Sequence, residues 1–373
     1  MILPKKYVTI ICNNSIRKEK GKMKTLPNGE QFLYNGRIDL SQPQRPLLTY
    51  PGCSVETEFT GNKLGIYVMN EAMFQYCSVG VILDGIQYKF ELKENDKEIY
   101  IEVPVRDNLD VHTLTVFKRQ AAAHYIRFCG IETEENANVS KPQKNYVLNI
   151  EVFGDSVSAG EICEALYYEG CSDYDEFKYV GYYDNSYFAY PYILGRKLNA
   201  RVFDNAQGGI ALMDKTGFFG GPEIDNIIGI ESTYDKASYV SYSEEGFTDW
   251  DFSRFTPDLI IMAVGQNDHN PDPSVIDNPE FTKRWKKKYK EIIADLRRRY
   301  NKPVKILMIL TLLIHDPKWD KLLDEIETEL SDGITKHFTF TRCGKATPGH
   351  PRITEQFEMA TELEACIREW FDL

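Results

Sequence analysis

The stretch VLNIEVFGDSVSAGE, residues 147–161, decides how the second half of the chain folds. Apolar residues alternate with polar ones up to Phe153, and Gly154-Asp155-Ser156 then ends the run. This pattern predicts a buried β-strand followed by a tight turn, because glycine permits the turn and the small residues at 158–160 let a helix begin close behind. Ser156 is then either a nucleophile at the end of a strand or a polar helix cap.

Strands and helices alternate from this point to the end of the chain. Residues 215–256 fit neither period and are expected to form an insertion near the top of the sheet. The alternation predicts an α/β/α domain with a five-stranded parallel sheet, whose ligands bind beyond the carboxyl ends of the strands. The predicted strands span 146–153, 200–204, 258–264, 303–311 and 335–340, and the predicted helices span 186–198, 278–301, 316–331 and 352–370.

The first part of the chain consists of short runs rich in β-branched and aromatic residues, separated by turn residues such as Asp84-Gly85. This pattern predicts an all-β sandwich of jelly-roll type. The polar segment around Pro142 is then the predicted linker. The chain is therefore expected to be multi-domain, with a β-sandwich over 1–135, a linker over 136–146 and the α/β domain over 147–373. The runs lie at 7–11, 32–40, 53–60, 63–70, 76–85, 86–92, 97–103 and 112–119.

The composition argues against several partners. A net charge of −12 disfavours nucleic acid and anionic membranes, which need a basic face, and the basic runs 284–288 and 297–299 fall on one predicted helix, where a solvated face is expected. The eight cysteines form no CxxC pair and no zinc-like spacing with histidine, so no disulfide framework and no metal site is expected. Without a signal peptide or a run near ~20 apolar residues, the expected location is cytoplasmic, with no membrane partner. The oligomeric state stays open.

Polar residues or glycines follow four of the predicted strands. Because the carboxyl ends of parallel strands meet at one edge, these residues are expected to lie together. A serine nucleophile, a histidine base, and glycine amides with an asparagine NH₂ as oxyanion donors would suit acyl transfer. The signals are Ser156, the pair Gly208-Gly209, Asn267 within GlyGlnAsnAsp at 265–268, and His350 just before the last helix. Further cleft candidates are Asp155, which is expected mainly to fix the turn, and Asp268, His269 and Trp250.

This ordered set resembles the SGNH or GDSL hydrolases, and a preceding β-sandwich makes the chain most similar to the family 2 carbohydrate esterases. The resemblance implies a flavodoxin-like SGNH domain, Ser156 as nucleophile, His350 as base, and an oxyanion hole from Ser156, Gly208 or Gly209, and Asn267. It also implies removal of O-acetyl groups from acetylated xylo- or manno-oligosaccharides through an acetyl-enzyme, without a cofactor or a metal.

One position departs from the family pattern. An aspartate usually stands three residues before the histidine, where this chain has Thr347. We therefore predict a Ser156–His350 dyad oriented by a backbone carbonyl, as in some family 2 esterases, with Asp332 or Glu355 as alternative acids. Two other functions remain open: an SGNH lipase or thioesterase acting on longer acyl chains, and a non-catalytic carbohydrate-binding protein.

Overall fold

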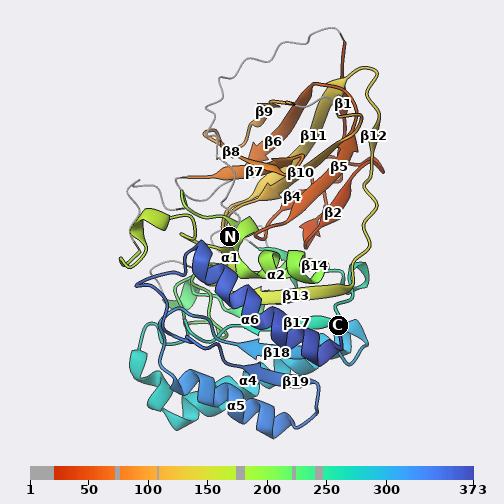
Figure 1. The fold of residues 1–373 in the computed structure, drawn as a ribbon. Helices are drawn as coiled ribbons and strands as arrows, with labels where there is room; N and C mark the ends of the chain where they lie inside the picture. The colour runs from red at the N-terminus through yellow and green to blue at the C-terminus, as the bar shows by residue number, and fades with distance from the viewer. Residues whose placement is uncertain (1–20, 72–75, 107–108, 174–180, 221–223, 240–246) are drawn as a thin grey trace.

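The chain folds into two stacked parts, a β-sandwich and an α/β domain (Figure 1). The computed structural model describes residues 21–71, 76–106, 109–173, 181–220, 224–239 and 247–373. The run predicted as a strand at 7–11 lies outside the described residues. The edge of the parallel sheet formed by β14 (Ala200–Asp204) lies toward the sandwich, and the edge formed by β19 (Thr335–Phe338) lies away from it.

Two six-stranded antiparallel sheets form the first part, which confirms the predicted sandwich of β-sheets. One has the order β3-β4-β11-β6-β9 with β1 on β11, and the other the order β12-β5-β10-β7-β8 with β2 on β5. Asp84 and Gly85 both have positive φ, 51° and 77°, as the hairpin between β7 and β8 requires. The strands are β1 (Lys22–Thr25), β2 (Leu33–Asn35), β3 (Ile38–Asp39), β4 (Leu47–Leu48), β5 (Ser54–Phe59), β6 (Leu64–Asn70), β7 (Ser78–Leu83), β8 (Ile86–Glu91), β9 (Glu98–Val103), β10 (His112–Lys118), β11 (Ile126–Glu134) and β12 (Val139–Ser140).

Three features of the sandwich differ from the predicted runs. The run at 32–40 is divided into β2 and β3 by Gly36, whose φ is 102° and whose added Cβ would lie 2.4 Å from Cys53 Sγ. Strand β11 was not predicted, because its end is acidic and looked like the start of a linker, yet it pairs with β1, β4 and β6. Strand β12, within the expected linker at 136–146, pairs with β5. The domain boundaries themselves stay a prediction.

The second part has a parallel sheet of order β14-β13-β17-β18-β19, the flavodoxin-like order 2-1-3-4-5, and this confirms the predicted fold class. Helices α2 and α6 pack on one face, and α4 and α5 cover the other (Figure 1). The remaining strands of the sheet are β13 (Leu148–Gly154), β17 (Leu259–Ala263) and β18 (Lys305–Ile309). The helices are α1 (Ser156–Ala159), α2 (Tyr190–Leu198), α3 (Ile230–Thr233), α4 (Pro279–Tyr300), α5 (Lys318–Leu330) and α6 (Ile353–Phe371), and β15 (Lys236–Ser238) pairs with β16 (Thr248–Asp249) in the insertion.

A buried ion pair joins the two parts. Arg37, between β2 and β3, donates from Nε to Glu151 Oε1 on β13 at 2.9 Å, and both side chains are fully buried. Tyr300 donates its hydroxyl to Glu151 Oε2 at 2.6 Å, and Asn205 donates to Oε1 at 3.0 Å. The guanidinium also donates to the carbonyl of Tyr234 at 2.6 Å, so its charge is paired and hydrogen-bonded.

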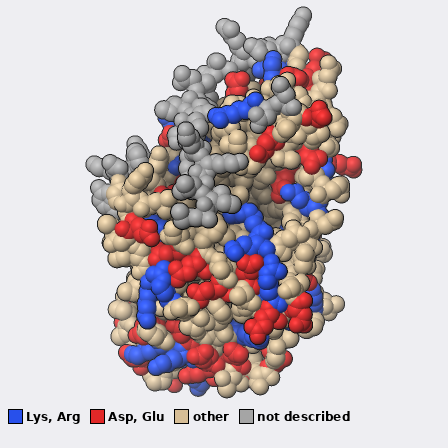
Figure 2. All heavy atoms as spheres, in the orientation of Figure 1, with Lys and Arg blue, Asp and Glu red and all other residues tan. Residues whose placement is uncertain are grey.

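Charged side chains of both signs are interspersed on the face of the α/β domain drawn in Figure 2. The basic runs lie on α4, and several of their side chains pair with acids: Lys286 with Glu325 and Glu329 of α5, and Arg297 with Asp332. Among the helices of the described chain, none is both long and apolar enough to cross a bilayer.

Candidate active site

Ser156 lies at the first turn after β13, as the sequence predicts. Asp155 is the N-cap of α1 and accepts a hydrogen bond from the Val157 amide at 3.0 Å. Gly154 is needed for close packing, because a Cβ there would lie 2.1 Å from Ser158 Oγ. The nucleophile candidate is therefore set at the carboxyl end of a central strand, with 4% of its surface exposed.

His350 meets Ser156 directly. Its Nε2 lies 2.7 Å from Ser156 Oγ, and its Nδ1 lies 2.9 Å from Asp173 Oδ2. Asp173 Oδ1 also accepts the backbone N–H of His350 at 2.6 Å, so one carboxylate holds both the ring and the main chain. Burial lowers the pKa of His350, but Asp173, with Glu161 and Asp155, outweighs burial and leaves the pKa raised above 6.5.

The carboxylate behind His350 corrects the expectation of a dyad oriented by a backbone carbonyl. Asp173 comes from the loop after α1 and not from the segment just before the histidine. Gly349 makes the approach possible, because its φ is 87° and a Cβ would lie 2.1 Å from Asp173 Oδ1. Thr347, at the usual aspartate position, accepts the Gly170 N–H and so ties the two loops together.

The two alternative acids serve other purposes. Asp332 accepts from Arg297 at 2.7 Å and from the Thr335 hydroxyl at 2.9 Å. Glu355 accepts the amide of Thr347 at 2.7 Å and the amide of Arg352 at 3.0 Å, as part of the capping box of α6. Neither contacts the His350 ring in the described structure, so both are positioning groups for the backbone.

The two candidate glycines have different neighbours, and Gly208 faces Glu161. A Cβ on Gly208 would lie 1.8 Å from Glu161 Oε1, whereas one on Gly209 would lie 2.9 Å from Phe218 Cβ. Within the described residues, neither the Ser156 amide nor the Gly208 amide donates a hydrogen bond to a protein acceptor, so both remain available to an oxyanion. Gly209 has φ 74°, and its carbonyl accepts the Phe218 amide at 2.7 Å, which makes it a turn residue.

Asn267 lies at the same edge, buried with 7% of its surface exposed. Its Nδ2 donates to Asp155 Oδ2 at 3.1 Å and to the Ile210 carbonyl at 3.0 Å. Both N–H groups of the Asn267 side chain are therefore held in place. Donation to an oxyanion would require one of these two hydrogen bonds to be shared or released.

Sequence reasoning missed an acidic cluster beside the serine. Burial, together with nearby Asp184, raises the pKa of Glu161 well above its usual range, and burial also raises the pKa of Asp184. Glu161 lies at the end of the stretch that predicted Ser156, so its place was visible in the sequence, while Asp173 is part of CSDYD without any recognisable spacing. A carboxyl with a raised pKa can donate a hydrogen bond near neutral pH.

The other cleft candidates have structural contacts. Burial raises the pKa of Asp155 to about 6, although it accepts from Val157 and Gln266. Asp268 is fully buried and accepts the Leu212 amide at 2.9 Å, which fixes the loop after β14. His269 bonds the carbonyl of Gln266 through Nδ1 at 2.7 Å.

Trp250 was expected near the cleft, but it packs at the junction of the two parts. Its ring lies 6.1 Å from that of Phe203 and 5.4 Å from the Arg37 guanidinium. The insertion around residue 250 therefore contributes to packing there.

Comparisons with known proteins agree with this architecture. Residues 34–142 match the family model described as Carbohydrate esterase 2 N-terminal. The structure of a family two carbohydrate esterase from Clostridium thermocellum in complex with cellohexaose superposes with a TM-score of 0.73 at 23% identity, covering 91% of this chain and 99% of that one. The chain has the fold of the family 2 carbohydrate esterases. This confirms the resemblance predicted from the motifs.

Two further relatives support the same resemblance. The acetyl xylan esterase Est2A from the rumen bacterium Butyrivibrio proteoclasticus gives a TM-score of 0.75 at 17% identity over 94% of this chain and 99% of that one. The cellulase/esterase CelE of Acetivibrio thermocellus is 28% identical over 274 residues. That alignment covers 72% of this chain and 30% of the relative, so this chain spans less than a third of that protein.

Proposed function

We propose that the chain is a serine esterase that removes O-acetyl groups from carbohydrates, with Ser156, His350 and Asp173 as its catalytic triad. The observation that carries the proposal is the continuous chain of contacts from Ser156 Oγ through the imidazole to the Asp173 carboxylate, at 2.7 and 2.9 Å. A serine, a base and an orienting acid in this order form the constellation of acyl-transfer enzymes.

The mechanism follows from the positions of these groups. His350 Nε2 takes the proton of Ser156 Oγ as the oxygen attacks the acetyl carbonyl, and Asp173 stabilises the imidazolium that forms. The amides of Ser156 and Gly208, with Asn267 Nδ2, receive the oxyanion. His350 then gives its proton to the leaving sugar oxygen, and water releases acetate from Ser156 by the same steps in a second round.

The proposed substrate class rests on the relatives and on an exposed aromatic ring. The solved relatives include an acetyl xylan esterase and a family 2 esterase bound to cellohexaose. In this chain Tyr167 is 97% exposed, in a loop whose neighbours Ala165 and Tyr168 accept hydrogen bonds from Arg352, two residues after His350. An exposed ring beside the site offers a flat face on which a sugar can stack.

Ser156→Ala tests the reaction class. We expect hydrolysis of p-nitrophenyl acetate to fall by at least a thousand-fold, because the nucleophile is lost. Ser253→Ala is the matched control, since this serine is exposed and bonds only Asp251. Residual hydrolysis of Ser156→Ala near the wild-type rate would exclude this serine as the nucleophile and would leave a carbohydrate-binding role open.

A second experiment separates the deacetylase from a lipase or thioesterase. Esters of p-nitrophenol from acetate to palmitate are compared by kcat/KM, followed by NMR of acetylated xylo- and manno-oligosaccharides. Preference for acetate and release of sugar-bound acetyl groups support the proposal. Preference for long chains would contradict it. The cytoplasmic location stays a prediction, tested by fractionating cells that produce the protein.

A further inference from the structure

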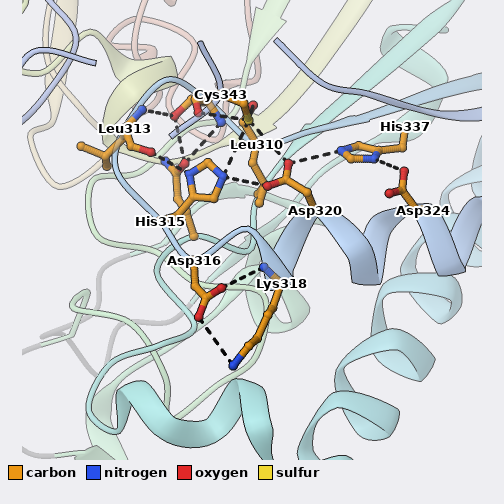
Figure 3. A network of polar contacts seen from close by, with 11 residues as sticks. Leu310, Leu313, His315, Asp316, Lys318, Asp320, Asp324, His337 and Cys343 are labelled. Carbon is orange, nitrogen blue, oxygen red and sulfur yellow. Dashed lines mark hydrogen bonds and ion pairs between the residues drawn. The ribbon is translucent and has the colours of Figure 1, made fainter. Parts of the chain in front are cut away.

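Four side chains with metal-binding atoms gather beside β18 and β19, away from the serine. They come from the loop after β18, the first turn of α5, β19 itself and the loop after it (Figure 3). The nearest pairs are His315 Nε2 to Asp320 Oδ2 at 3.0 Å, Cys343 Sγ to Asp320 Oδ1 at 3.5 Å, Cys343 Sγ to His315 Nε2 at 3.7 Å, and His337 Nε2 to Asp320 Oδ1 at 3.6 Å.

The outer nitrogens of both histidines are fixed by acceptors. His315 Nδ1 lies 2.6 Å from the Leu313 carbonyl and His337 Nδ1 lies 2.8 Å from Asp324 Oδ1, so each Nδ1 carries a hydrogen. In a neutral ring, Nε2 then presents a lone pair, and both lone pairs face Asp320. These contacts are the outer partners that metal-bound histidines commonly have.

His337 faces Asp320 from the side opposite His315 (Figure 3). Its side chain is 1% exposed, yet within the described residues its Nε2 has no partner at hydrogen-bond distance. A buried ring nitrogen without a partner is costly. On the side of His315, a nitrogen lone pair faces a carboxylate oxygen at 3.0 Å, and this pair needs either an added proton or a cation between its members.

We propose that His315, Asp320 and Cys343 bind a divalent transition metal, with Zn²⁺ as the best fit, and that His337 orients the Asp320 carboxylate from its other side. The ligand atoms of the first three all lie within 4.8 Å of one another. A tetrahedral zinc ion with Zn–N near ~2.0 Å and Zn–S near ~2.3 Å places its ligand atoms about 3.3–3.6 Å apart, close to the pair distances found here. An imidazole, a thiolate and a carboxylate suit zinc, and Cys343 would release its proton to water as the metal binds.

The site lies at the base of the segment that carries His350. Beyond Cys343, the Gly344 amide donates to the Thr311 carbonyl at 3.1 Å and the Ala346 amide donates to the Leu312 carbonyl at 2.7 Å. A metal here would lock the loops after β18 and β19 to α5. Its role is to position the histidine loop and not to contact substrate, and the site itself does not depend on the proposed function.

Cobalt titration of the whole chain tests the proposal. After treatment with a chelator, Co²⁺ is expected to bind at one equivalent and give a thiolate-to-cobalt charge-transfer band with intense tetrahedral visible bands. Cys343→Ser should remove the charge-transfer band, while Cys366→Ser, at a half-buried free cysteine on α6, should keep it. His337→Gln should weaken the Kd for zinc about 10- to 100-fold, because it removes the ring that faces the second oxygen of Asp320.

Two results would overturn the proposal. One is the absence of stoichiometric Co²⁺ or Zn²⁺ binding, which would leave His315, Asp320 and His337 as a metal-free ion-pair cluster. The other is a charge-transfer band that persists in Cys343→Ser. If Cys343→Ser does not fold, the melting temperature of the wild type decides: zinc should raise it, and an unchanged value after chelation and after zinc addition would count against the site.

Discussion

Replacing Asp173 by asparagine removes one negative charge behind His350 and keeps the shape of the side chain. Asp173 Oδ2 lies 2.9 Å from His350 Nδ1, and the other oxygen accepts the His350 amide at 2.6 Å. During attack by Ser156 the imidazole becomes positive, and the carboxylate stabilises that charge. The variant should therefore lose stabilisation of the transition state and keep most of the ground-state geometry.

The size of the effect follows from the contact distance and the exposure. Two unit charges 2.9 Å apart interact by about 1.4 kcal/mol at the dielectric constant of water and about 6 kcal/mol at an effective value of 20. The Asp173 side chain is 35% exposed, so solvent screens the pair and the lower part of this range applies. With about 1.4 kcal/mol for each factor of ten, we expect kcat to fall about 10- to 100-fold.

The assay is kcat and kcat/KM for p-nitrophenyl acetate across pH. His350 must be neutral to act as base, so wild-type activity should fall as the pH drops through its pKa, which Asp173 helps to raise above 6.5. In Asp173→Asn the pKa of His350 is lower. The fall of kcat on the acid side should therefore move to lower pH, while the maximal kcat decreases. Asp332→Asn is the control, because that acid bonds Arg297 and Thr335. If Asp173→Asn has the same maximal kcat and the same acid-side pH dependence as the wild type, the triad is refuted and the predicted dyad is restored.

Three further outcomes are expected. Asn267→Ala should lower kcat about 10²- to 10³-fold, and it should also lower the melting temperature because Asp155 Oδ2 and the Ile210 carbonyl lose a buried donor. Steady-state kinetics and thermal scans measure the two effects, and a loss of kcat below ten-fold would contradict the role of Asn267 as an oxyanion donor. Gly208→Ala should impair activity because its Cβ would lie 1.8 Å from Glu161 Oε1, and activity equal to wild type would place the oxyanion amide elsewhere. Arg37→Met should lower the free energy of unfolding by about 3–5 kcal/mol in urea titrations, because Glu151 is left as an unpaired buried charge, while adding Glu151→Leu should recover part of the loss.

Four of the site residues could be predicted from the sequence, because each of them follows a predicted strand. Ser156, Gly208, Asn267 and His350 each follow a strand of one parallel sheet, and parallel strands bring their carboxyl ends to the same edge. Periodicity was sufficient for the five strands of the parallel sheet and for α2, α4, α5 and α6, because buried elements repeat apolar residues at fixed steps, but it did not predict α3, β15 or β16 in the insertion.

The role of Asp173 could not be predicted from periodicity or from strand order. Asp173 lies in a loop without periodicity, and tertiary contacts between this loop and residues 347–352 bring it to His350. The dyad was inferred from one missing residue, Thr347, although another loop supplies the carboxylate. Trp250 was misplaced for a similar reason, because sequence shows that a ring is present but not which surface it covers.

The Arg37–Glu151 contact has a consequence for how the molecule unfolds. Glu151 lies on β13, five residues before Ser156, and its charge is neutralised by a residue of the sandwich. Without the sandwich, Glu151 would lose Arg37 and remain as a buried charge without a cation on the strand that precedes the nucleophile. The isolated α/β domain is therefore expected to be less stable. Thermal denaturation should then show a single cooperative transition for both parts, and excising either one should yield a fragment that melts at lower temperature.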